Sequence, residues 1–160
     1  MATGHARCDV CAAGGRQRAV QGHECFGASA PFGALGLQSW QAVEIPEVVN
    51  LCAKLASETM RVGAAHGYQL DAIFGLSPEE FMGPEEKIID KLLYTILGHM
   101  GKKGSRTARG VVYQDLLKGR RTETDYLNGH IARKGREKGI PTHLLRSIAL
   151  TESGRWDEAS

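Results

Sequence analysis

From residue 45 onward, apolar residues recur every three or four positions, and no stretch alternates apolar and polar residues as a half-buried strand would. The clearest run begins at Pro46, which suits the first turn of a helix, and stops at Gly67. One face of this run consists of Val48, Cys52, Leu55, Thr59 and Val62. The spacing predicts a long amphipathic helix between the proline and the glycine.

Other segments carry start signals for helices on both sides of a basic loop at residues 101–110. Ser77 and Glu80 have the spacing of a capping box, so a short helix is expected there. The segment 84–100 has the widest apolar stripe, with acidic residues at its N-terminal end, and is expected to be the central helix. After the loop, a short helix is expected over Val111–Gly119.

Two more helices are predicted in the last third of the chain. Thr122 is a suitable N-cap residue, and Asp125 three residues later makes a variant of the capping box. This helix is expected to stop at Gly139. Thr142 is expected to cap a last helix that runs to about Leu150.

The predicted class is therefore all-α, a compact bundle of about five or six helices with an irregular N-terminal arm. Aromatic residues make up only 6% of the chain, so the core is expected to consist mainly of Leu, Ile, Val and Ala. Residues 1–41 are rich in Gly and Ala and keep no period, which predicts the arm. The helical domain is placed at residues 42–152, and a polar tail at residues 153–160.

No membrane span is expected. The longest mostly apolar run, Ile88–Leu97, contains Asp90 and Lys91 and is much shorter than the ~20 apolar residues that cross a bilayer. Residues 1–20 lack the apolar stretch of a signal peptide. We therefore expect a cytoplasmic protein, in which disulfides are rare.

The net charge of +2 conceals a basic segment, Gly101–Ile140, with 11 Lys or Arg residues and 4 Asp or Glu residues. Such a segment either binds phosphate, on a nucleotide cofactor or on nucleic acid, or is simply a solvated helix face. Aromatic side chains do not interleave with the basic ones for base stacking, so nucleic-acid binding is not favoured.

The arm contains four residues with the spacing of zinc ligands. Cys8 and Cys11 form a C-x-x-C pair, and His23 and Cys25 form a second close pair. Around them the arm lacks the apolar residues that would build a small zinc module. Incidental cysteines in an irregular arm are therefore the alternative to a metal site.

The segment QDLLKGRRTETDYLNGHIARKGREKGIPT, Gln114–Thr142, resembles the signature of the C-terminal domain of 2-dehydropantoate 2-reductases (ketopantoate reductases). That family has a pattern close to QD-x-x-x-G-R-x-T-E-I-D-x-x-N-G, followed by a Gly-rich basic helix that ends in G-[IV]-P-T-P. Here Thr124 replaces the usual Ile, and His143 replaces the second Pro. A weaker similarity covers about Pro31–Ile148. The matching positions are Gln114, Asp115, Gly119, Arg120, Thr122, Glu123, Asp125, Asn128, Gly129, Gly135, Gly139, Pro141 and Thr142.

The resemblance implies a helical domain of an enzyme that transfers a hydride from NADPH to the ketone of 2-dehydropantoate, a small 2-keto acid, in pantothenate biosynthesis. It implies that Glu123 is a catalytic residue at an interdomain cleft. There an ionised carboxylate would hydrogen-bond a substrate hydroxyl or hold a catalytic ammonium group. Asp125 and Asn128 of the same motif are expected to bind substrate, with Asp125 also capping its helix. No cofactor-binding residue is identified.

The sequence also departs from the family pattern. The G-x-G-x-x-G turn of the Rossmann domain does not occur in it. The family has a K-x-x-x-N-x-x-x-N-P run, and aligning its proline on Pro31 places Gly22 at the catalytic lysine. Phe26 and Ala30 then stand at the two asparagines, and Val111 at the substrate-binding serine.

We therefore expect the substrate-binding and dimerisation part of an NADPH-dependent 2-dehydropantoate 2-reductase, inactive alone and arising by truncation, frameshift or degeneration. Its expected partners are a second copy of the chain or a Rossmann-containing relative. The alternative is a non-catalytic helical interaction domain with a zinc-binding N-terminal arm.

Overall fold

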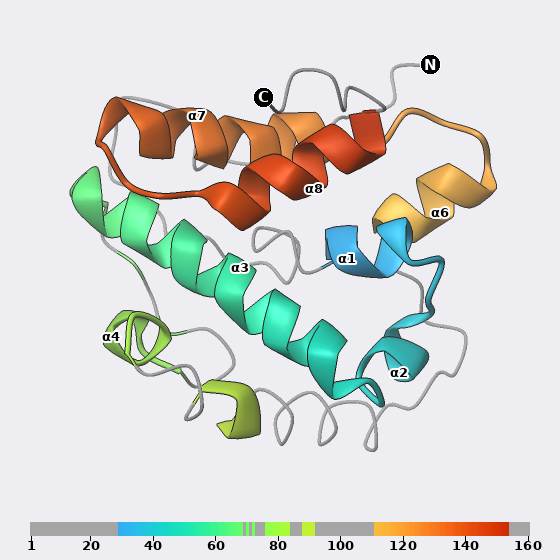
Figure 1. Cartoon of the computed structure of the whole chain (residues 1–160), viewed down its shortest axis with the longest axis horizontal. Helices are drawn as coiled ribbons and strands as arrows, with labels where there is room; N and C mark the ends of the chain where they lie inside the picture. Colours follow the sequence, from blue (N-terminus) through green and yellow to red (C-terminus); the bar gives the residue numbers. More distant parts are fainter. Residues whose placement is uncertain are drawn as a thin grey trace, which may run out of the picture.

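Helices dominate the computed structural model, which describes residues 29–68, 70, 72, 76–83, 88–91 and 111–153 (Figure 1). The described residues form no β-strand, which confirms the all-α class. None of their helices is long and apolar enough to cross a membrane. The elements are α1 (Ser29–Ala34), α2 (Ser39–Ala42), α3 (Pro46–Ala65), α4 (Pro78–Phe81), α6 (Val111–Leu117), the π-helical segment η2 (Asp125–Gly129), α7 (His130–Glu137) and α8 (His143–Ser153).

The predicted long helix is α3, which runs diagonally across the molecule with α7 and α8 on one side and α4 on the other (Figure 1). Proline occupies its first turn, and Gly67 ends it with a φ of 74°, in the left-handed region that a glycine adopts without strain. At this end, Nε2 of His66 lies 3.0 Å from the carbonyl oxygen of Lys134 in α7. The helix thus joins the two sides of the domain.

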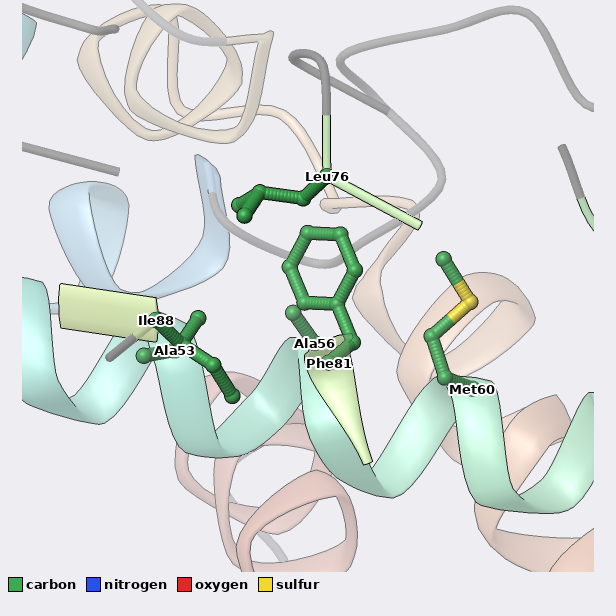
Figure 2. Close-up of a cluster of buried hydrophobic side chains, with 6 residues drawn as sticks. All are labelled: Ala53, Ala56, Met60, Leu76, Phe81 and Ile88. Carbon is green, nitrogen blue, oxygen red and sulfur yellow. The ribbon is translucent and has the colours of Figure 1, made fainter. Parts of the chain in front are cut away.

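Three hydrophobic clusters of the described residues lie along α3. In the first, the small side chains of Ala53 and Ala56 leave room for the ring of Phe81 from α4 (Figure 2). Met60, Leu76 and Ile88 complete it. The second cluster joins α3 to the helices at both ends of the described chain and consists of Ala30, Leu55, Val112, Ala132, Leu145 and Ile148. As expected, aliphatic residues make up most of the core.

The start of α4 confirms the predicted capping box. Ser77 Oγ accepts a hydrogen bond from the Glu80 backbone N–H at 3.3 Å, and the Ser77 N–H donates to Glu80 Oε2 at 2.8 Å. Lys91 also pairs with the Glu80 carboxylate. Of the predicted helix at 84–100, residues 88–91 are helical and the others lie outside the described residues, as does the basic loop.

Helices α1 and α2 lie within the stretch where the sequence predicts an irregular arm. Ala30 is buried in the second cluster, and α1 packs so closely on α6 that a Cβ on Gly33 would lie 2.3 Å from Val112 Cγ1. The packed domain therefore includes residues from Ser29 onward, whereas the sequence places its start at residue 42. Residues 1–28 and the tail from residue 154 lie outside the described residues.

The N-terminus of α8 is capped from α3. Glu58 Oε1 and Oε2 accept hydrogen bonds from the backbone N–H groups of Leu144 and Leu145 at 3.1 and 3.0 Å. These are the amides that an N-cap side chain normally satisfies, and a negative charge suits this end of the helix. Thr142 precedes the helix as predicted, but its hydroxyl donates to the carbonyl oxygen of Ala132 at 3.4 Å. The cap therefore comes from a distant glutamate.

A glycine allows α7 to approach α3. A Cβ on Gly135 would lie 2.5 Å from Thr142 Cγ2, 3.1 Å from the Ile140 carbonyl oxygen and 3.1 Å from Val62 Cγ2. Contacts under 3.0 Å do not occur without movement of one partner. At this position α7 therefore lies directly against its neighbours.

The cap on α8 can be tested by Glu58→Gln. We expect the free energy of unfolding to fall by about 1 kcal/mol, because a neutral amide caps a helix less strongly than a carboxylate. Urea unfolding followed by circular dichroism measures the change. The same substitution at the exposed Glu44 is the control and should leave the midpoint unchanged. Equal stability of the two variants would contradict the cap.

A second test concerns the close approach at Gly135. Alanine is the better helix former by roughly 1 kcal/mol, but overpacking costs about 1–3 kcal/mol, so we expect Gly135→Ala to destabilise the domain. Thr142→Ser removes the Cγ2 atom that the new Cβ would meet. Gly135→Ala should therefore lower the free energy of unfolding less in the Thr142→Ser variant than in the native chain. An additive double-mutant cycle, or a stabilising alanine, would contradict this packing.

Candidate functional site

The T-E-T-D segment, Thr122–Asp125, follows α6 and leads into the start of η2. Gly119, with a φ of 62°, ends α6 as predicted, and the Arg120 N–H donates to the Asp115 carbonyl oxygen at 2.8 Å. Thr122 and Thr124 are then buried, with exposed fractions of 8% and 1%, whereas Glu123 between them is exposed. The two threonines anchor the connection and leave the carboxylate at the surface.

The helix that follows begins as a π-helical turn, η2. The sequence predicts Thr122 as its N-cap, but the segment begins later, after Thr124, with no side-chain capping hydrogen bond. A π-helical turn is wider than an α-helical one, and such turns are frequent at functional sites. This one contains two of the three residues predicted for the site, Asp125 and Asn128.

An arginine two turns further along holds the outer side of η2. Arg133 Nη1 lies 3.3 Å from Asp125 Oδ1, and its Nη2 donates to the Asp125 carbonyl oxygen at 3.3 Å. Gly129, midway between them, permits this pairing because a Cβ there would lie 2.5 Å from the carboxylate oxygen. The carboxylate of Asp125 therefore faces Arg133, and its contact with a substrate stays a prediction.

Asn128 occupies the inner side of the same turn. Its exposed fraction is 1%, and neither Nδ2 nor Oδ1 has a hydrogen-bond partner among the residues that the structure describes. A substrate at the surface therefore cannot reach this amide directly. Of the three predicted site residues, only Glu123 is exposed.

The charges around the turn are mostly positive. Burial, with Arg133 and Lys134 nearby, lowers the pKa of His130, so its imidazole is neutral near pH 7. Lys134 pairs with Glu137 at 2.8 Å, and the exposed Lys118 and Arg121 lie beside the T-E-T-D segment. A solvated basic face and a phosphate-binding one both remain compatible with this arrangement.

The other residues that the sequence selects are not brought to this turn by the described structure. Two positions of the family pattern lie outside the described residues: Gly22, at the place of the catalytic lysine, and Phe26, at the place of the first asparagine. The predicted zinc ligands also lie outside them, namely Cys8, Cys11, His23 and Cys25. Ala30 is a buried core residue. Within the described ranges, no group of three His, Cys, Asp or Glu side chains is arranged to hold a metal ion.

Cys52 contributes to packing and not to chemistry. It lies in α3 in a cluster with Ala42 and Val48, and burial raises the pKa of its thiol to about 12. The thiol is therefore protonated at neutral pH, whereas nucleophilic or metal-binding cysteines act as thiolates.

The described residues do not fit a nicotinamide dinucleotide. Its pyrophosphate normally binds a Gly-rich turn between a β-strand and a helix, and the described part of the chain forms no strand. The sequence also contains no G-x-G-x-x-G. We therefore assign no cofactor contact to these helices.

Sequence reasoning did not identify two residues that shape the site. Arg133 lay within a basic run that could equally be a solvated face, and its signal was the spacing of Asp125, Gly129 and Arg133 at every fourth residue. No local sequence pattern predicts the bonds of Glu58 to residues 86 and 87 positions away.

Comparisons with known proteins agree with this geometry. A solved structure titled "The complex structure of D-mandelate dehydrogenase with NADH" matches with a TM-score of 0.60 and 19% identity, over 85% of this chain. At that identity the likeness shows the fold alone. The chain spans 46% of that dehydrogenase chain, so less than half of its length has a counterpart here. A search of curated proteins finds no match.

The family comparison covers most of the described domain. The family described as "Ketopantoate reductase PanE/ApbA C terminal" matches residues 29–150, which is more than half of the chain and begins at the first residue of α1. The match includes the buried threonines, the exposed Glu123 and the π-helical turn. The chain therefore belongs to the ketopantoate reductase C-terminal family.

Proposed function

We propose that this chain is the substrate-binding helical part of a nicotinamide-dependent 2-keto acid reductase, with 2-dehydropantoate as substrate in cytoplasmic pantothenate biosynthesis. We also propose that these residues alone do not reduce the ketone. The observation that supports the proposal is the exposed Glu123 between the buried Thr122 and Thr124, ahead of a π-helical turn. In the family signature this glutamate is the active-site carboxylate.

The chemistry of a carboxylate fits the binding role. Glu123 is exposed, and an ionised carboxylate accepts a charge-assisted hydrogen bond from a substrate hydroxyl. It would equally hold an ammonium group that protonates the alkoxide formed by ketone reduction. The position of that ammonium group in the family pattern is Gly22, which carries no acid. The proposed role of Glu123 is therefore to orient the substrate, with the proton supplied from elsewhere.

The hydride donor in this proposal is NADPH, bound by a nucleotide-binding domain beyond these residues. The chain is proposed to dock on that domain, or on a second copy of itself. Apolar surface supports docking, because Leu116, Leu117 and Tyr126 are exposed, the last at 68%. Light scattering of the purified chain would distinguish a monomer from a dimer.

The proposal predicts weak binding of the product-like acid pantoate at the turn. Without the other half of the site we expect a dissociation constant of about 1 mM, with NMR shifts concentrated between Thr122 and Gly129. Glu123→Gln should weaken binding about tenfold, because it removes the charge from the acceptor. Glu44→Gln, an exposed glutamate elsewhere, should leave the affinity unchanged.

Two results would contradict the proposal. Absence of pantoate binding, or shifts that Glu123→Gln leaves unaltered, would remove the binding role. Steady oxidation of NADPH by the purified chain with 2-dehydropantoate would show that these residues suffice for turnover.

A further inference from the structure

The inner face of the helix that contains the family motif has a buried polar residue. Thr124, Asn128 and Ala132 recur every fourth residue, and all three are buried. The turn packs against α8 and continues directly into α7. Asn128 is thus a carboxamide at a position where helices in a core normally carry an apolar side chain.

The amide of Asn128 lacks the partners that a buried polar group needs. Both Nδ2 and Oδ1 are buried, and within the described part of the chain neither has a hydrogen-bond partner. Leaving such a group dry is strongly unfavourable, and more than nine in ten buried polar groups in proteins are paired with protein atoms or with ordered water. Buried waters typically bind polar groups of this kind.

One water molecule matches the chemistry of this group. A primary amide presents an N–H and a carbonyl oxygen on the same side, so a single water accepts from Nδ2 and donates to Oδ1. A larger ligand is disfavoured because the exposed fraction of Asn128 is 1%. The site is buried within η2, whereas the pairing of Arg133 with Asp125 in the same turn is partly exposed.

We infer that Asn128 binds an ordered internal water and that this hydrated amide holds η2 in the shape that presents Glu123. Leu127, the residue before Asn128, donates its N–H to the Glu123 carbonyl oxygen at 3.0 Å. This hydrogen bond connects the backbone next to Asn128 with the backbone of Glu123. Asn128 is therefore a positioning residue and not a substrate contact. Only the part that concerns Glu123 rests on the proposed function.

The water site is tested first in the unsubstituted chain by NMR. We expect the side-chain amide protons of Asn128 to show a rotating-frame Overhauser effect to a long-lived water, with a signal absent from Asn128→Leu. Lack of such a water, with the amide resonances assigned, would overturn the inference.

Stability gives an independent measurement. Removing an amide that water satisfies should lower the melting temperature of Asn128→Leu by roughly 4–10 °C, whereas removing a dry amide should leave it unchanged or raise it. Arg61→Leu is the control for the new leucine, since Arg61 is exposed in α3, and its melting temperature should change little. A melting temperature of Asn128→Leu at or above the native value would overturn the water site.

The positioning role is tested by measuring pantoate binding to the native chain and to Asn128→Leu, at a temperature well below the melting temperatures of both proteins. Asn128→Leu should weaken pantoate binding about tenfold and shift the Glu123 amide resonance, although the substrate does not touch residue 128. Asn128→Asp, which keeps a polar group that binds water, should restore part of the affinity. Native affinity in the leucine variant would overturn the positioning role. Absence of pantoate binding in the unsubstituted chain would overturn the proposed function, while the water measurements would still decide the water site.

Discussion

Two hydrogen bonds to one carboxylate hold the longest helix of this domain against its last one. Glu58 in α3 accepts the N–H groups of Leu144 and Leu145, which α8 cannot satisfy within its own first turn. Because the capping carboxylate belongs to another helix, and not to a residue next to α8, it fixes both the position and the direction of α8. The π-helical turn packs mainly on α8, so its place in the domain follows from this cap.

The shape of the turn follows from a second constraint, the spacing of Asp125, Gly129 and Arg133. A Cβ on Gly129, between the two residues, would lie 2.5 Å from the Asp125 carboxylate oxygen, so this side chain would have to move before it could pair with Arg133 in the same way. Arg133 also binds the backbone carbonyl of Asp125, so its guanidinium fixes the main chain as well as the side chain. The pair is partly exposed, and such ion pairs contribute little to stability. Its effect is therefore mainly on the geometry of the turn.

The sequence predicted those features that depend on neighbouring residues. The helix α3 begins at Pro46 and ends before Gly67, and Ser77 forms the capping box with Glu80, as predicted. Each of these signals acts within one turn of the backbone. The helix after Thr122 was placed correctly, but its start and its π-helical form were not, since they depend on Arg133 and on packing against α8.

Long-range contacts explain the other differences between prediction and structure. The arm was expected to be irregular because α1 and α2 are too short to show a period, and α1 forms a helix where it packs on α6. Similarly, a threonine directly before a helix is normally its cap, yet Thr142 bonds to Ala132 while Glu58 takes the cap. Of the candidate site, local pattern and family resemblance together predict Glu123, whose role stays a prediction, but they do not predict the contacts of Arg133 and Glu58.

The arrangement separates two requirements of a reductase site. Among the described residues, the buried Thr122 and Thr124 and the arginine that holds Asp125 contribute to the shape of the turn around Glu123. A carboxylate held in this way needs no cofactor for its orientation, so a substrate-binding surface is compatible with a chain that carries no dinucleotide-binding turn. Protonation of an alkoxide, in contrast, requires an acid close to the carbonyl, and the family position for it is glycine. Under the proposed function, binding and turnover are therefore separable, and loss of the second would not imply loss of the first.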